Sequence, residues 1–61
     1  MANLTEKELS ALEDQLGMEQ VLIKKYKSYA GIAQDPQIRD VCNRLAARHK
    51  QHYDTLMGHL Q

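Results

Sequence analysis

The stretch Gln34-Asp35-Pro36-Gln37 decides the fold, because it interrupts an otherwise continuous helical pattern near the middle of the 61-residue chain. Asp35 is a favourable N-cap, and Pro36 at the first helical position loses no hydrogen bond. Proline also disfavours helical geometry at the residue before it. We therefore predict a tight turn at 34–36, with one helix ending before it and another beginning at it.

The predicted first helix covers about residues 5–34. Thr5 and Glu8 have the spacing of a capping box, which satisfies two free amides at a helix start. Apolar residues then recur every three or four positions, the period of an amphipathic helix. This stripe comprises Leu9, Leu12, Leu16, Ile23, Tyr26, Ala30 and Ala33, and Leu22, Tyr29 and Ile32 widen it into an arc. An arc this wide needs more than one neighbouring helix to cover it.

The predicted second helix covers about residues 36–60. Its apolar face comprises Ile38, Val41, Cys42, Leu45, Ala46, Tyr53, Leu56, Met57 and Leu60. Few residues are β-branched and nothing alternates with period two, so no strand is expected. The fold class is all-α: an antiparallel two-helix hairpin, taken as a single domain over 1–61.

A hairpin this short cannot bury much of its own apolar surface. Cys42 is the only cysteine, so an intrachain disulfide cannot supply the missing stability. Small domains otherwise rely on a metal or a partner chain. We expect two copies to form a homodimeric four-helix bundle, in which short loops and ordinary packing angles cover both arcs.

Charge and hydropathy exclude several classes of partner. Eight basic residues balance eight acidic ones, which is unlike the basic surface of a nucleic-acid binder or a polybasic membrane patch. The longest apolar run is far too short to span a bilayer. No signal-peptide pattern is present at the start, so we expect a cytoplasmic protein with no nucleic-acid or membrane partner.

Three polar residues interrupt the apolar stripes near the middle of both helices. The periodicity places Glu19 on the core face of the first helix and His49 and His52 on that of the second. Glu19 lies 16 residues before Asp35 and Gln51 lies 16 after it, so a hairpin sets Glu19 level with the segment 49–52. Dimerisation would then gather two copies of this set into one layer.

Two interpretations of this layer stay open, besides the exposure of both histidines to solvent. Imidazole and carboxylate groups are common ligands of zinc and iron, and Glu19, His49 and His52 are the candidate metal residues. Alternatively, the layer is structural, fixes the register of the helices and binds nothing. No arrangement for nucleophilic catalysis and no phosphate-binding loop is visible, so we do not expect an enzyme.

Several short segments resemble the bacterial spore coat F-like family, which is related to the ferritin-like bundles. They are Leu4-Thr5-Glu6-Lys7-Glu8-Leu9, the segment from Glu19 to Tyr26, the turn from Asp35 to Arg39, and His49-Lys50-Gln51-His52. The resemblance implies a structural or assembly protein of the spore coat, with other coat proteins as further partners.

The ferritin-like resemblance also implies a metal site, but the ligands differ. Glu19 matches the first glutamate of the di-iron pattern, whereas His49-x-x-His52 stands where the family has Glu-x-x-His. Loss of a carboxylate removes negative charge that stabilises oxidised iron. The alternative function is therefore a ferritin-like bundle that binds zinc or another divalent metal, with oxygen chemistry disfavoured.

Overall fold

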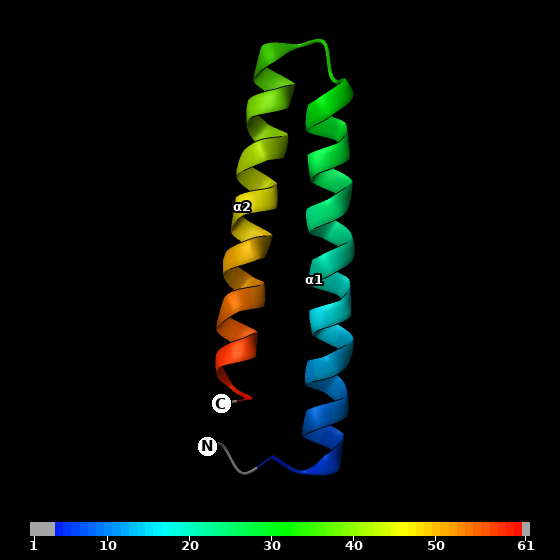
Figure 1. Cartoon of the computed structure of the whole chain (residues 1–61), viewed down its shortest axis with the longest axis vertical. Helices are drawn as coiled ribbons and strands as arrows, with labels where there is room; N and C mark the ends of the chain where they lie inside the picture. Colours follow the sequence, from blue (N-terminus) through cyan, green and yellow to red (C-terminus); the bar gives the residue numbers. More distant parts are fainter. Residues whose placement is uncertain (1–3, 61) are drawn as a thin grey trace.

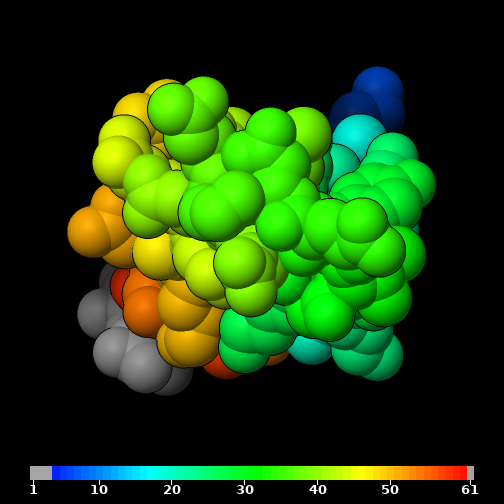
Figure 2. Space-filling view, turned by 90° about the horizontal axis from the view of Figure 1, so that it is seen from above, coloured from blue at the N-terminus to red at the C-terminus, as the bar shows by residue number. Residues whose placement is uncertain are grey.

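The chain folds into two long antiparallel helices joined by a short turn (Figure 1). The computed structural model describes residues 4–60; residues 1–3 and 61, the ends of the predicted domain range, lie outside the described part. Its Cα atoms span 46 × 15 × 10 Å, so the molecule is a rod one helix pair thick. Figure 2 looks down this rod from the turn, whose side chains cover the near ends of both helices.

Helix α1 covers Glu6–Ile32 and begins at the capping box that the sequence predicts. The Thr5 hydroxyl accepts a hydrogen bond from the Glu8 amide at 3.1 Å, and the Thr5 amide donates to Glu8 Oε1 at 3.0 Å. The helix ends at Ile32, two residues before the predicted end, because Ala33 already has extended backbone angles. The chain uses residues 33–35 to reverse its direction.

Helix α2 covers Pro36–Gly58 and begins where the sequence predicts. The Asp35 carboxylate accepts a hydrogen bond from the Gln37 amide at 2.8 Å, and Pro36 occupies the first turn. The helix ends two residues before the predicted position, with His59 as its C-cap. Both helix starts therefore follow from local side-chain chemistry.

The contact between the two helices is narrow. Cys42 and Ala46 are the buried hydrophobic residues within 4–60, and none of the large side chains there is completely buried. The small Ala46 side chain, 3% exposed, lies in the contact with α1. The two helices therefore meet along a narrow line of contact, which we call the seam and which includes Cys42 and Ala46, and the described hairpin has no larger core.

Many residues of the predicted apolar arcs remain in contact with solvent. Ile32 is 75% exposed, and Tyr29, Ile38 and Val41 are each about half exposed. Leu9, which the periodicity assigns to the core stripe, is also exposed, because α2 ends before reaching that level of α1. This agrees with the expectation that one hairpin leaves much of both arcs uncovered; the dimer that would cover them is not part of this structure.

Neither helix is long and apolar enough to cross a membrane, as judged over the described residues.

Candidate functional site

Glu19 is the buried charged residue at the centre of the described hairpin. It lies midway along α1, on the face toward α2, and is only 5% exposed. Its position in the three-and-four spacing of Leu12, Leu16 and Ile23 places it in the seam. A carboxylate in such a place must be paired to be tolerated.

The partners of Glu19 are the two histidines that the hairpin register predicts. His49 Nδ1 lies 2.6 Å from Glu19 Oε1, which is a short hydrogen bond. His52 Nδ1 lies 3.5 Å from the other carboxylate oxygen, longer than a good hydrogen bond. The structure thus confirms that Glu19, His49 and His52 come together, and it places them at unequal depth. The His49 side chain is 19% exposed and that of His52 is 50% exposed.

Two further residues support this group: Gln15, which the sequence pattern did not single out, and Tyr26, which it placed in the apolar stripe. Gln15 Nε2 donates to Glu19 Oε2 at 3.2 Å from one turn earlier on α1. Tyr26 stacks on the His49 ring, with 5.8 Å between centroids and 6° between planes. The spacing of four between Gln15 and Glu19 was a usable signal, since such residues are neighbours on a helix surface. The stacking depends on the exact inter-helix distance, which periodicity does not give.

The carboxylate of Glu19 stays ionised despite its burial. Burial by itself would raise its pKa, but the hydrogen bonds from His49 and Gln15, with the charges of His49 and His52, hold the pKa below the ordinary value of 4.5. Each carboxylate oxygen therefore has a partner: His49 at one and Gln15 at the other. Within the described residues, no buried side-chain nitrogen or oxygen lacks a hydrogen-bond partner. The polar layer is therefore self-sufficient, in the sense that both oxygens of Glu19 are hydrogen-bonded without any added ligand.

The same residues also have the composition of a metal site. One ligand atom from each of Glu19, His49 and His52 lies within 4.8 Å of the others. Around a tetrahedral zinc ion with bonds of about 2.1 Å, ligand atoms lie about 3.4 Å apart. The separation of 3.5 Å between Glu19 Oε2 and His52 Nδ1 already matches this, whereas His49 Nδ1 is hydrogen-bonded to the other carboxylate oxygen, Oε1, at 2.6 Å and would have to move to share one ion with them. Two histidines and one carboxylate suit zinc or iron and leave room for a fourth ligand.

This group opens to solvent on one side of the hairpin. A shallow groove between the helices is lined by Gln15, Glu19, His52, Thr55 and Leu56. The plane of the His52 ring is perpendicular to that of the His49 ring, with 5.3 Å between the ring centroids, and His52 lines one side of this groove. A ligand can therefore reach Glu19 and His52 without separation of the helices.

The other residues considered from the sequence have simpler surroundings. Cys42 is a buried free thiol in the seam. Tyr53 accepts a hydrogen bond from Gln20 across the helix pair at 3.3 Å, and Lys50 forms an exposed ion pair with Asp54 at 2.6 Å. The Gln20–Tyr53 hydrogen bond joins the two helices, and the Lys50–Asp54 ion pair lies on the surface of α2. Neither contact adds a residue to the central group.

Comparison of the chain with protein-family models, with curated proteins and with solved structures finds no match.

Proposed function

We propose that the chain is a structural or assembly protein, which completes its core by pairing with a second copy in a four-helix bundle and performs no catalysis. The observation that carries this proposal is the lack of a core within 4–60, where Cys42 and Ala46 are the buried hydrophobic residues. Large apolar side chains that would fill the interior of a bundle are instead in water.

The exposed area supports the same proposal. A compact folded protein of 7.0 kDa is expected to expose about 4000 Å². The hairpin exposes 4932 Å². The surplus of about 900 Å² is close to the area of about 800 Å² that each partner buries in a standard interface. One partner of similar size is enough to cover it.

The self-sufficient polar layer also favours a structural role. Because His49 and Gln15 satisfy Glu19 without any ligand, the layer can fix the register of a bundle as it is. The resemblance to the spore coat F-like family adds the cellular setting to the proposal: a ferritin-like bundle made in the cytoplasm and assembled with coat proteins in the spore coat.

Sedimentation velocity of the untagged chain at micromolar concentration tests this function. We expect a species of twice the 7.0 kDa chain mass, with helical circular dichroism. A monomer that keeps its helices across this concentration range would refute the homodimer and would instead indicate a hairpin that docks on a different protein.

A second candidate function is metal binding, which the clustering of Glu19, His49 and His52 within 4.8 Å favours. Metal analysis after incubation with zinc and iron salts tests it, and absence of stoichiometric metal would eliminate it. Joint replacement of Glu19 and His49 by leucine separates the two functions. A structural layer predicts a dimer of equal or greater stability, as apolar replacement of both partners of a buried ion pair often gives. A metal site predicts that stabilisation by added metal disappears.

A further inference from the structure

Most of the exposed large apolar side chains lie on one face of the hairpin, bordered by Asp14 on α1 and by Arg44 and Arg48 on α2. On α1 they follow the spacing of a single helical stripe, and the same holds on α2. We call this surface the apolar face; it consists of the exposed residues Met18, Val21, Tyr29, Ile32, Ile38 and Val41 and the half-buried Leu22.

The groove beside Glu19 shows that the two stripes share one side of the molecule. Gln15 lines that groove and lies two helical turns before Leu22, so it belongs to the α1 stripe. His52 lines it too and lies four turns after Ile38, so it belongs to the α2 stripe. Both stripes therefore border the same groove, and the candidate site opens onto the apolar face.

The opposite side of the hairpin has a different character. Its groove between the helices is lined by Gln20, Ile23, Lys24, Lys27, Lys50 and Tyr53. Three lysines in one groove suit contact with water rather than burial against a neutral copy of the same chain. The apolar face is the one that a second copy would cover.

The apolar face is concentrated in the half of the rod nearest the turn. Because Glu19 lies level with 49–52, Ile32 lies level with Ile38 and Tyr29 lies level with Val41. At the other end of the rod, the α1 stripe continues through Gln15 and Ala11, which offer little apolar surface.

Two face-to-face arrangements are compatible with two-fold symmetry. With both turns at the same end, α1 faces the partner's α2 at equal level, so Ile32 meets the partner's Ile38 and Tyr29 meets the partner's Val41. With the turns at opposite ends and the axis near Glu19, Ile32 would instead meet the partner's Lys7. The first arrangement buries apolar surface against apolar surface, and the second exposes it to a polar segment.

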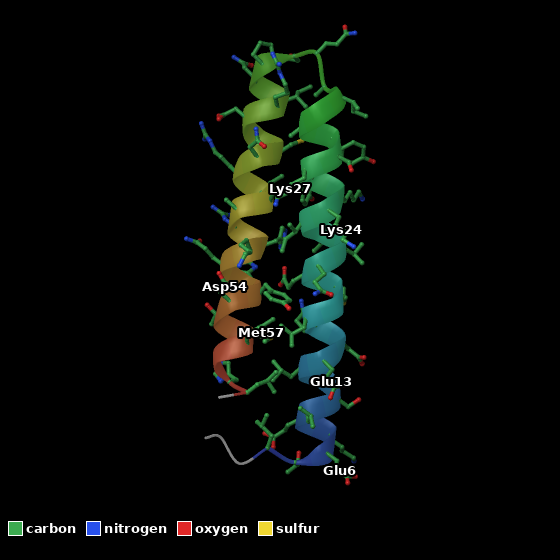
Figure 3. All side chains as sticks on the ribbon, in the orientation of Figure 1. Glu6, Glu13, Lys24, Lys27, Asp54 and Met57 are labelled. Carbon is green, nitrogen blue, oxygen red and sulfur yellow. The ribbon has the colours of Figure 1, made fainter. Side chains whose placement is uncertain are left out.

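Charge does not decide between the two arrangements. Glu6 and Glu13 lie in the lower half of α1 and Lys24 and Lys27 in the upper half (Figure 3), but Lys24 and Lys27 line the opposite groove and so lie away from the apolar face. Exposed ion pairs contribute little in any case and are screened by salt within about 10 Å. Burial of several large apolar side chains outweighs them.

We infer that a second copy covers the apolar face with both turns at the same end, so that the two-fold axis runs parallel to the helices. This inference rests on the proposed homodimer and specifies its geometry. It covers the half-exposed His52 and brings both Glu19–His52 groups to one level on the shared interface. Any metal bound there would be enclosed by two chains rather than one.

Double electron–electron resonance on spin-labelled dimers tests the orientation. Labels are attached to Gln37→Cys near the turn or to Glu6→Cys at the other end, in a Cys42→Ala background whose dimerisation is verified by sedimentation. We expect both symmetric pairs to lie within about 25 Å, since packed helices are only 8–10 Å apart. A mixed dimer with one label of each kind should give a distance near the 46 Å length of the rod.

The possible results are distinguishable. A long distance between the labels at Gln37 would show turns at opposite ends and overturn the inference. A short distance at Gln37 with a long one at Glu6 would show copies that overlap only near the turn, and would overturn it as well. Failure to dimerise in sedimentation would instead remove the proposed function on which the inference rests.

A pair of substitutions tests which face is covered. Ile38→Ser should weaken the dimer by at least about tenfold in Kd, because it removes a large, half-exposed apolar side chain from the apolar face. Lys27→Ser, on the opposite groove, is the matched control and should leave Kd within about twofold. Equal effects of the two substitutions would show that the apolar face is not the interface.

Discussion

Metal binding, the second candidate function, predicts that zinc raises the unfolding temperature of this protein and that replacement of His52 by glutamine removes most of that rise. The ligand atoms of Glu19, His49 and His52 lie within 4.8 Å of one another. Side-chain movements of about 1 Å are therefore enough to bring them to the separations found around a zinc ion. His52 is half exposed, so its replacement removes a ligand while disturbing little packing. The variant should therefore fold normally and bind zinc poorly.

The size of the effect follows from binding linkage. Free zinc at about a hundred times its Kd stabilises a folded protein by about 2.7 kcal/mol. For a domain of this length, each kcal/mol moves the midpoint by about 4–8 °C. We therefore expect a rise of about 10–20 °C for the wild type, reversed by a chelator, and at most a few degrees for His52→Gln.

Thermal unfolding followed by far-UV circular dichroism measures this shift, with protein concentration held fixed because the proposed dimer makes the midpoint concentration-dependent. His59→Gln is the matched control, since His59 caps the end of α2 outside the central group and should not affect the response to zinc. An unchanged midpoint in the wild type, or an equal rise in the His52→Gln variant, would refute metal binding at this site and leave the structural interpretation.

Four further predictions concern the fold. Thr5→Ala should lower the free energy of unfolding by about 1 kcal/mol in urea titrations, because it removes the N-cap hydroxyl that binds the Glu8 amide. Hydrogen bonding to Thr5 holds the pKa of Glu8 below its ordinary value of 4.5. The contribution of Glu8 to stability is therefore complete above about pH 4.5 and is lost as the pH falls through the lower pKa of the folded state. In urea titrations from about pH 3 to 6, the free energy of unfolding should fall less steeply with decreasing pH in the Glu8→Gln variant than in the wild type. Ala46→Leu should lower the free energy of unfolding by about 1–3 kcal/mol, because the larger side chain overpacks the seam. A thiol reagent should modify the buried Cys42 slowly in the native protein and rapidly in urea.

The helix starts and the register could be predicted from the sequence because they depend on local chemistry. Thr5 with Glu8, and Asp35 with Pro36, satisfy free amides within a few residues of themselves, so no distant contact is needed to place them. The register then follows by counting from the turn, and it correctly brings Glu19 to His49. Only the helix ends were misplaced, because the energy difference between one more helical residue and an extended one is small.

The depth of each side chain could not be predicted in the same way. Periodicity assigns His49 and His52 to the same broad arc, yet one is four-fifths buried and the other half exposed. The difference arises from where each ring lies relative to α1, and the periodicity of α2 alone does not give that position. The pattern also cannot distinguish an apolar side chain that is buried within the hairpin from one that stays exposed on it, as Ile32 and Ile38 do.

His52 is the residue on which the two interpretations of the central layer differ most. A purely structural layer is already complete with Glu19, His49 and Gln15, since these satisfy both carboxylate oxygens. His52 adds no good hydrogen bond to this arrangement, yet its ring nitrogen lies 3.5 Å from the carboxylate, at the open edge of the group and on the face that a second copy would cover. Within the hairpin alone, its contribution is the charge that helps to lower the pKa of Glu19. The imidazole gains a further use when something else arrives at that face, whether a metal ion, a second copy of the chain, or both together.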